Sequence, residues 1–351
     1  MIKAKIITHH LNFKKPAGTS RGVLLDKPTW YLVLKHQLTN STGIGECSLI
    51  PGLSLDSLEY VEQKLNEIAN RINANDIPKL IEYIEYPSIQ FALETALEDL
   101  AFAENFNPYP GDFSLGKKQI PINGLVWMGD ESFMQQQIQE KINNGFKCIK
   151  LKIGAIDFQT ELNLLKAIRS KFSAKEIEIR VDANGAFTPE TAMQKLEQLS
   201  KLNIHSIEQP IKQDQWNQMA ALCANSPIPI ALDEELIGVL DTGDQLQMLE
   251  FIRPQYIILK PSLIGGIQAA NTWIDIAESK NIGWWATSAL ESNIGLNAIA
   301  QWVSNINTDM PQGLGTGQLF TNNISSPLTI KNGELYHNTE PNWNTDLFKD
   351  V

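Results

Sequence analysis

Cysteine is scarce in this chain, which limits the kinds of fold that the sequence could encode. The 351 residues include three cysteines, Cys47, Cys148 and Cys223. An odd number with no close pair argues against a disulfide framework and against a zinc site. We therefore expect a protein of a reducing compartment, with the cytoplasm as its default location.

Long apolar runs are also missing from the sequence. No stretch approaches the roughly 18 apolar residues that a membrane-spanning helix needs. The first ten residues, MIKAKIITHH, contain no apolar core of the kind found in signal peptides. We expect neither a membrane anchor nor secretion.

Positive charge is outnumbered in this protein. There are 29 Lys and Arg residues against 40 Asp and Glu residues, which gives a net charge of -11. Nucleic acid and anionic membranes bind basic surfaces, so the sequence predicts neither as a partner. A small-molecule carboxylate suits as a partner, because a local basic pocket can lie within an acidic protein. A homo-oligomer is left open.

The first part of the chain, residues 1–112, predicts an α+β domain. Two segments rich in β-branched and aromatic residues, KAKIITHHLNF and WYLVLKHQL, predict strands, and NSTGIG at residues 40–45 predicts a turn. Two helical patterns follow. SLDSLEYVEQKLNEIANRI begins with a Ser/Asp cap, and PSIQFALETALEDLAFAE opens with proline in its first turn. The segment NPYPGDFSLGKK, residues 107–118, reads as a linker.

From about residue 119, short apolar runs alternate with longer helical patterns, which predicts a parallel sheet. The runs are QIPINGL, KCIKLKI, IEIRVDAN, IHSIEQP, IPIALDEE, YIILKPS, GWWATSA and QGLGTG. Eight runs favour a closed (β/α) barrel, which typically takes about 250 residues. The alternative, an open doubly wound sheet, would usually carry G-x-G-x-x-G, which PINGLVWMG lacks. We expect a barrel over residues 113–318, with residues 319–351 packing back on the first domain.

Polar residues recur near the ends of these runs, at intervals of 25 to 30 residues. They are Lys150, Lys152, Asp182, Glu208, Asp233, Lys260 and Ser288. Each interval is about one strand plus one helix, so successive strands would bring one polar group each to the same rim of the barrel. Barrel enzymes place their active sites at the rim formed by the carboxyl ends of the strands. The sequence therefore predicts an active site there.

The run CIKLKIG alternates three aliphatic residues with two lysines. By itself it could be a half-exposed antiparallel strand whose lysines face water. In a barrel, the same alternation would pack Ile149, Leu151 and Ile153 against the outer helices. Lys150 and Lys152 would then point into the interior.

Charges gathered inside a barrel must compensate one another, because isolated buried charges are too costly. Asp182, Glu208 and Asp233 come from three consecutive predicted strands and would form a hard oxygen site. Such a site suits Mg²⁺, with Mn²⁺ as a substitute. The alternative is a structural ion network in which the lysines neutralise the carboxylates.

Lys152 and Lys260 come from the second and sixth predicted strands, so they would stand on opposite sides of the barrel mouth. A substrate carboxylate held between them by the cation could accept negative charge, which makes the proton on its α-carbon easier to remove. A lysine that removes this proton must first be neutral, and the positive charge of Lys150 beside Lys152 favours that form.

In order and spacing, these residues resemble the catalytic set of the enolase superfamily, in particular its muconate-lactonizing-enzyme-like subgroup. The resemblance covers the whole chain. It implies a modified (β/α)7β TIM-type barrel with an α+β capping domain. It also implies that Asp182, Glu208 and Asp233 bind the metal and that Lys152 and Lys260 are catalytic, with Lys150 assisting them.

The finer resemblance is to the o-succinylbenzoate synthase family. It is carried by KPAGTSRG, GIGECSLIPGLS, IRVDANGAF, LKPSLIGG, SALESNIGLNAIAQ and GLGTGQLFTNN. This resemblance implies dehydration of 2-succinyl-6-hydroxy-2,4-cyclohexadiene-1-carboxylate to o-succinylbenzoate in menaquinone biosynthesis. Lys152 would remove the α-proton and then protonate the departing hydroxide, while Lys260 would stabilise the negative charge that forms.

Seven residues are expected to bind or brace the substrate: Thr19, Ser20, Arg21, Arg180, Asn184, Ser288 and Gly315. The first three would form a mobile lid with Arg21 near a succinyl carboxylate; an exposed loop is the alternative. Arg180 would brace the site beside Asp182. The glycines of GLGTG would let a substrate approach the eighth strand closely, in preference to cradling a phosphate.

Other function classes stay open. The mandelate-racemase branch uses a histidine near the seventh strand, but GWWATSALES offers none, and His205 falls on the outward face of its strand. Dipeptide epimerases tend to carry Asp-x-Asp at the eighth strand, where this chain reads GLGTGQ. An N-succinylamino acid racemase would share the whole catalytic set. A catalytically silent barrel used for binding or assembly is disfavoured, because every lysine and carboxylate is intact.

Overall fold

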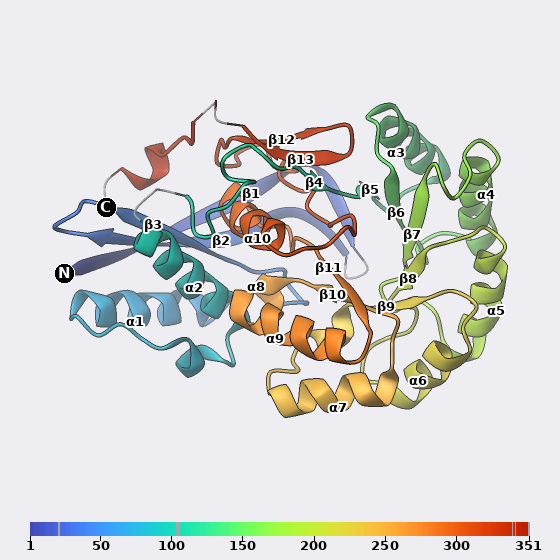
Figure 1. The fold of residues 1–351 in the computed structure, drawn as a ribbon, viewed down its shortest axis with the longest axis horizontal. Coiled ribbons are helices and arrows are strands. Elements are labelled where there is room, and N and C mark those ends of the chain that lie inside the picture. Colours follow the sequence, from blue (N-terminus) through green and yellow to red (C-terminus); the bar gives the residue numbers. More distant parts are fainter. Residues whose placement is uncertain (20–21, 103–105, 339, 341, 350–351) are drawn as a thin grey trace.

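The computed structural model describes residues 1–19, 22–102, 106–338, 340 and 342–349 (Figure 1). Two residues of the predicted lid, Ser20 and Arg21, lie outside the described residues. Thr19 is described in its backbone alone, as the last residue of the first strand.

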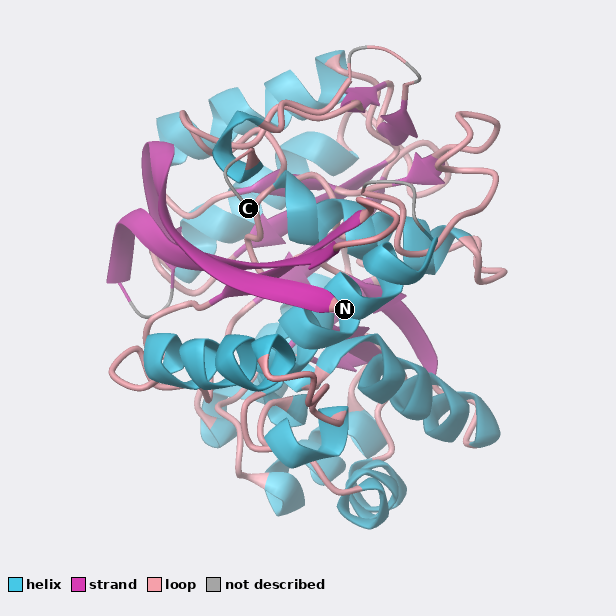
Figure 2. Ribbon diagram, turned by 90° about the vertical axis from the view of Figure 1, so that its left-hand side faces the viewer, coloured by secondary structure: helices cyan, strands magenta, loops and turns pink. Residues whose placement is uncertain are grey.

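The first part of the chain forms an antiparallel sheet of β1 (Ile2–Thr19), β2 (Gly22–His36) and β3 (Thr42–Ser48), here called the N-terminal sheet. Its long curved strands lie across one side of the molecule (Figure 2). Two helices, α1 (Val61–Asn73) and α2 (Pro87–Phe102), and the 3₁₀ turn Leu80–Tyr83 follow it. Alternate residues of β2, including Leu32 and Leu34, are buried against both helices, while Tyr31 and Val33 are buried on the opposite face, so the sheet is covered on both sides there.

The first helix begins later than the sequence predicted. Its expected Ser/Asp cap is wrong, because α1 begins at Val61 without a side-chain cap. Asp56 instead accepts hydrogen bonds from the backbone N–H groups of Ser88 and Ile89, at 3.0 and 3.4 Å, in the first turn of α2. Four free N–H groups at a helix start attract a carboxylate, and here the start of the neighbouring helix lies within reach. The proline start of α2 is confirmed.

Glycine on β3 allows the N-terminal sheet to meet α2 closely. A Cβ atom at Gly45 would lie 1.8 Å from the carbonyl oxygen of Ala92, and one at Gly43 would lie 2.2 Å from that of Ala96. Any larger residue would push the helix away from the sheet. The pattern NSTGIG was interpreted as a turn alone. Its two glycines, Gly43 and Gly45, are also needed for the close packing of β3 on α2.

The second part of the chain alternates strands and helices. Seven strands pair in parallel and in chain order: β5 (Gly124–Val126), β6 (Cys148–Lys152), β7 (Glu178–Asp182), β8 (Ser206–Glu208), β9 (Ile230–Leu232), β10 (Tyr256–Leu259) and β11 (Gly283–Ala286). The helices between and after them are α3 (Glu131–Asn143), α4 (Phe158–Arg169), α5 (Pro189–Ser200), α6 (Trp216–Asn225), α7 (Thr242–Ile252), α8 (Pro261–Ile264), α9 (Gly266–Ser279) and α10 (Asn293–Ser304). Most of these helices lie around the outside of the strands (Figure 1).

The eighth predicted run is not a regular strand, but it closes the sheet. Gln312 and Gly313 form isolated parallel bridges to Ile122, just before β5, and to Thr287, just after β11. Gln312 N–H donates to the carbonyl of Pro121 at 2.8 Å, and Gly313 N–H donates to that of Ala286 at 2.8 Å. The segment thus lies between the first and last strands of the sheet. The fold is the predicted TIM-type barrel of the (β/α)7β kind, with an α+β domain before it.

Side-chain alternation in the barrel strands is confirmed. Ile149, Leu151 and Ile257 belong to the large core between the strands and the outer helices. Ala231, Ile258 and Trp285 form a separate cluster on the other face of the same strands, inside the barrel.

The outward placement of His205 was wrong. Its ring lies 5.2 Å from that of Tyr256 and 6.4 Å from that of Trp285, centre to centre. His205 precedes β8, where strict alternation no longer applies. It therefore joins the interior rings at the amino end of the strands, away from the predicted rim.

The last part of the chain contacts both preceding parts. β12 (Leu328–Lys331) and β13 (Glu334–His337) form a small antiparallel sheet with β4 (Ile120–Pro121). The ring of Phe348, in the 3₁₀ turn Asp346–Phe348, meets Tyr31 of the N-terminal sheet edge-on at 5.3 Å. A division into domains at residues 112 and 318 remains our proposal.

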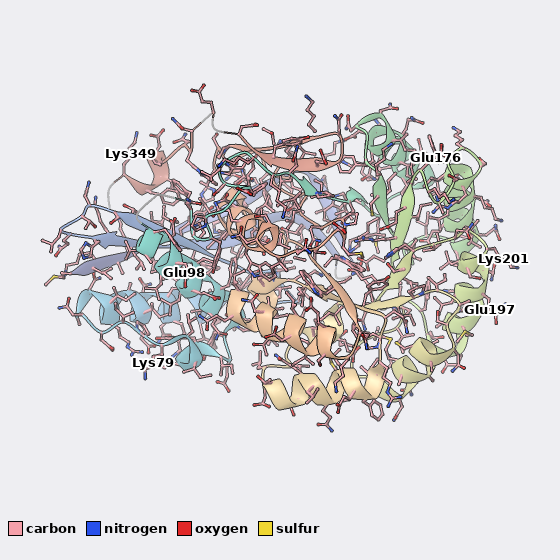
Figure 3. The ribbon with its side chains drawn as sticks, viewed as in Figure 1. Lys79, Glu98, Glu176, Glu197, Lys201 and Lys349 are labelled. Atoms are coloured by element: carbon pink, nitrogen blue, oxygen red, sulfur yellow. The ribbon has the colours of Figure 1, made fainter. Side chains whose placement is uncertain are left out.

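Charged residues on the barrel helices, such as Glu197 on α5 and the neighbouring Lys201, project outward (Figure 3). Among the described residues, no helix combines the length and apolar character needed to cross a membrane. All three cysteines are buried and free.

Candidate active site

A cavity opens at the carboxyl ends of the barrel strands, where barrel enzymes place their active sites. It is lined by Ile50, Leu53, Asn123, Leu125, Trp127, Lys150, Lys152, Asn184, Glu234, Lys260, Thr287, Ser288, Ala289, Leu290, Gly313, Gly315 and Thr316. The rim predicted from the sequence is therefore where the structure forms a pocket.

The two lysines of β6 converge on one carboxylate. Lys150 Nζ lies 2.9 Å from Asp182 Oδ2, and Lys152 Nζ lies 3.0 Å from the same oxygen. Lys150 also pairs closely with Glu208. β6 runs parallel to β5 and β7 and Lys150 is 8% exposed, so the half-exposed antiparallel strand is excluded.

Lys260 reaches the pocket from the opposite side of the barrel. It follows β10, the sixth strand, whereas Lys152 ends β6, the second. Lys260 pairs closely with Asp233. Burial lowers the pKa of Lys260, but attraction to Asp233 and Glu234 outweighs it, so the pKa is raised above its ordinary value. Lys260 is therefore held as a cation beside the cavity.

The three carboxylates form one buried cluster. Asp182, Glu208 and Asp233 are 0%, 2% and 1% exposed. Burial and repulsion from Asp182 raise the pKa of Glu208 well above its usual range, despite Lys150. Burial also acts to raise the pKa of Asp182, but attraction to Lys150 and Lys152 reverses this and holds it well below its usual range. Glu208 therefore lies close enough to its acidic neighbours for their charges to oppose its ionisation.

Among the residues that the structure describes, no three His, Cys, Asp or Glu side chains are already arranged to hold a metal ion. The carboxylates are engaged by lysine ammonium groups instead. Two observations still fit a hard cation. All three candidate donors are carboxylates, and Glu208 Oε1 is buried without a hydrogen-bond partner. The three carboxylates are therefore suitable ligands for Mg²⁺. Their ion pairs with Lys150 and Lys260 are also compatible with the alternative, a structural ion network without a metal.

Asn184 joins Lys152 to a second acid. Its Oδ1 accepts from Lys152 Nζ at 2.7 Å, and its Nδ2 donates to Glu234 Oε1 at 2.9 Å. Its own N–H donates to Asp182 Oδ1 at 2.9 Å, and its φ is 43°. Asparagine tolerates this left-handed backbone better than most residues. Asn184 therefore orients Lys152 from the loop after β7.

Arg180 lies away from the pocket. Its Nε donates to Glu178 Oε1 at 2.7 Å and one terminal nitrogen donates to the carbonyl of Pro311 at 2.9 Å. Its guanidinium carbon lies 4.2 Å from the ring centre of Trp285, inside the barrel. These contacts place Arg180 under the site, where it braces the interior, and a direct contact with substrate stays a prediction.

Ser288 and Gly315 line the cavity. A Cβ atom at Gly315 would meet its neighbours at 3.5 Å, an ordinary contact, whereas one at Gly313 would lie 2.0 Å from Thr287 Oγ1. Within GLGTG, close neighbours therefore constrain Gly313, next to Thr287 just after β11, and also Gly317, where a Cβ atom would lie 2.6 Å from Asn293 Oδ1. The expected close approach of substrate at Gly315 stays a prediction.

Several pocket residues were missed by sequence reasoning. Glu234 was one of them. Its place directly after Asp233, in LDEE, was the sequence feature that could have indicated its contact with the pocket. Ile50 and Leu53 reach the pocket from the loop after β3, and no local pattern indicates a contact with the barrel.

Comparison with known proteins agrees with this geometry. Residues 134–342 match the family described as enolase C-terminal domain-like. The o-succinylbenzoate synthase of Desulfotalea psychrophila (strain LSv54 / DSM 12343) is 50% identical over 356 residues, covering 93% of this chain and 96% of that protein. The L-amino acid-D/L-Glu epimerase of Francisella philomiragia subsp. philomiragia is 28% identical over 289 residues, covering 77% of this chain and 78% of that protein.

Among solved structures, the crystal structure of MenC from Desulfotalea psychrophila LSv54 is similar to this chain, with a TM-score of 0.85 and 45% sequence identity. The match covers 95% of this chain and 99% of that chain.

Proposed function

This chain belongs to the enolase C-terminal domain-like family, and we propose that it is a Mg²⁺-dependent lyase of that family. Its reaction would be the dehydration of 2-succinyl-6-hydroxy-2,4-cyclohexadiene-1-carboxylate to o-succinylbenzoate, a step of menaquinone biosynthesis. We further place it in the cytoplasm, in line with three cysteines that form no disulfide.

The observation that carries this chemistry is a pair of lysines on opposite sides of one pocket, beside three buried carboxylates. Removal of a proton next to a carboxylate needs a base on one side and positive charge where negative charge develops. The 50% identity with an o-succinylbenzoate synthase favours dehydration over the other reactions that such a pocket could catalyse.

Each residue has a distinct role in the proposed reaction. Lys152 removes the proton on the α-carbon of the substrate carboxylate and then gives a proton to the departing hydroxide, so that one water leaves. Lys260 remains charged and stabilises the negative charge that forms. Lys150 shares Asp182 Oδ2 with Lys152 and adds positive charge beside the base.

Asp182, Glu208 and Asp233 would hold Mg²⁺, which when bound supplies positive charge to offset the charge on a substrate carboxylate. Asn184 keeps the amino group of Lys152 in place through its 2.7 Å hydrogen bond. The apolar side chains of Ile50, Leu53 and Leu290 help to exclude water from the pocket.

The test is turnover of the cyclohexadiene carboxylate, followed by loss of its diene absorbance with Mg²⁺ and then with excess EDTA. Lys152→Ala is compared with Lys166→Ala, which removes an exposed lysine of α4. We expect Mg²⁺-dependent turnover that Lys152→Ala abolishes and Lys166→Ala preserves. No turnover by the folded, Mg²⁺-supplied wild type would overturn the proposal.

A second candidate is racemisation or epimerisation of an N-succinylamino acid or a dipeptide. Lysines on two sides of a pocket could remove a proton from one face of a carbon and return it to the other. A relative that is 28% identical is named an epimerase. Incubation with N-succinylamino acids and dipeptides in D₂O distinguishes this candidate, because it requires deuterium to appear at the α-carbon.

A further inference from the structure

A chain of buried hydroxyl groups leads from one wall of the pocket to Glu291. Ser288 and Thr316, here called the hydroxyl wall, both line the cavity. Thr316 Oγ1 donates to Ser288 Oγ at 2.8 Å, and Ser288 Oγ donates to Glu291 Oε2 at 2.5 Å. Ser262 Oγ donates to the other oxygen, Oε1. Glu291 is 0% exposed and lies between β11 and α10.

The direction of these hydrogen bonds follows from the chemistry of the carboxylate. A carboxylate can only accept, so Ser288 gives its single proton to Glu291. Ser288 Oγ then accepts from Thr316 and from the N–H of Leu290, the latter at 3.0 Å, which occupies both of its lone pairs. The proton of Thr316 is likewise committed to Ser288. The hydroxyl wall therefore donates no hydrogen bond to a ligand. Thr316 Oγ1 can still accept a hydrogen bond from one.

A buried lysine from the N-terminal sheet faces the same carboxylate. Lys27 of β2 is 0% exposed and donates to the carbonyl of Leu290 at 2.9 Å and to Ser48 Oγ. Burial lowers the pKa of Lys27, while attraction to Glu291 and Glu46 opposes that shift. Lys27 therefore lies close enough to Glu291 for their opposite charges to attract.

The other buried acid of this cluster has its own donors. Glu46 accepts from the N–H of Ser292 at 2.7 Å, from its hydroxyl at 2.6 Å, and from the N–H of Gly295 at 2.8 Å, in the first turn of α10. Because Glu46 remains beside Lys27, removal of Glu291 would leave one lysine against one carboxylate. A variant at residue 291 should therefore fold.

We propose that Glu291 is a positioning residue that sets the specificity of the pocket by turning the hydroxyl protons of Ser288 and Thr316 away from it. The hydroxyl wall then accepts hydrogen bonds from hydroxyl or amide groups of a ligand and gives none to carboxylate or ketone oxygens. The identity of the ligand in the test below depends on the proposed function.

The product o-succinylbenzoate is a suitable probe, because at neutral pH its two carboxylates and its ketone all accept hydrogen bonds. The matched pair of proteins is Ser262→Ala and the double variant Ser262→Ala with Glu291→Leu. Both lack the Ser262 hydroxyl, so they differ in the carboxylate of residue 291, which accepts from Ser288 and faces Lys27. Replacing both hydrogen-bond partners with apolar groups of similar size is close to neutral for stability.

Calorimetric titration with the product, in the presence of Mg²⁺, gives the dissociation constant for each protein. We expect the double variant to bind the product about three- to tenfold more tightly than Ser262→Ala, because a hydroxyl proton becomes available to it. Damage to the fold would weaken binding instead. Equal or weaker binding by a double variant of unchanged melting temperature would overturn the proposal.

Neutron diffraction from the deuterium-exchanged wild type gives an answer that needs neither a folded variant nor a bound product. The deuterium on Ser288 Oγ should point at Glu291, and that on Thr316 Oγ1 at Ser288. A deuterium on Glu291, or one directed from Thr316 into the cavity, would contradict the inference. If the product binds to none of the proteins, the proposed function fails while this measurement still decides the role of Glu291.

Discussion

Lys150 and Lys152 of β6 differ in their surroundings, although both contact Asp182 Oδ2. Lys152 alone also bonds to Asn184, whereas Lys150 pairs with Glu208. Burial lowers the pKa of Lys150, but attraction to Asp182, Glu208 and Asp233 outweighs burial and raises it. Lys150 is therefore held as a cation, which is consistent with our proposal that Lys152 and not Lys150 is the base.

The charge of Lys260 can be tested through its separate effects on kcat and KM. Lys260→Ala should lower kcat by about 10²- to 10³-fold while KM changes little, because its interaction strengthens as negative charge develops. Steady-state kinetics with the cyclohexadiene carboxylate measures both. A rise in KM with unchanged kcat would show that Lys260 serves substrate binding instead.

The three carboxylates can be tested without any turnover. Mg²⁺ that binds the folded state alone stabilises it by about 2.7 kcal/mol at a hundredfold excess over Kd, so we expect the melting temperature to rise by several degrees. The rise should disappear with excess EDTA and in Glu208→Gln. If saturating Mg²⁺ leaves the wild-type melting temperature unchanged, the structural ion network is the better interpretation.

At the scale of elements, α2 and α9 are joined by one buried carboxylate. Glu94 of α2 accepts from the N–H groups of Ile267 and Gln268 in the first turn of α9, at 2.6 and 3.0 Å. Burial raises the pKa of Glu94 to about 7, against the effect of these two bonds. A Cβ atom at Gly266 would lie 2.2 Å from its carboxylate, so that contact requires glycine.

This shift predicts a pH dependence of stability. Because its pKa is higher in the folded state, Glu94 binds more protons there, and stability falls as pH rises from about 4.5 to about 7. Between pH 4 and pH 8, the wild type should lose about 3 kcal/mol relative to Glu94→Gln, which cannot ionise. Urea unfolding of both proteins across this range measures the difference. A constant difference would mean that Glu94 titrates alike in both states.

The strand patterns and the barrel rim were readable from the sequence because each repeat encodes its own alternation. Ile149 and Leu151 face the helices, while Lys150 and Lys152, which alternate with them, face inward, as the period of two requires. The eighth run was harder, because two bridging residues close the barrel where a full strand was expected. The late start of α1 also had no local signal, since Asp56 belongs to the start of α2.

At the scale of the whole molecule, a buried cluster joins the N-terminal sheet to the barrel. Lys27 of β2 bonds to the carbonyl of Leu290, and Glu46 of β3 bonds to Ser292 and Gly295. Leu290 also lines the pocket. The contact between the N-terminal sheet and the barrel therefore helps to fix Leu290, and with it one wall of the pocket.

Lys27→Met should destabilise the protein by about 3–5 kcal/mol, because it leaves buried carboxylates without their cation. Chemical denaturation gives this free energy, and Lys171→Met, at an exposed position, serves as the control. A loss below about 1 kcal/mol would show that the cluster tolerates the missing charge.

The sequence alone determined the order of the barrel strands and predicted that Lys150, Lys152, Lys260 and the three carboxylates gather at one rim, as they do. Periodicity and spacing are local properties, so they can be recognised in the sequence without a structure. Only the tertiary structure decided that Arg180 lies beneath the pocket, that Ile50 and Leu53 enter it and that Glu291 holds the protons of Ser288 and Ser262. These features depend on contacts between side chains from elements far apart in the chain, and no local sequence pattern predicts such contacts.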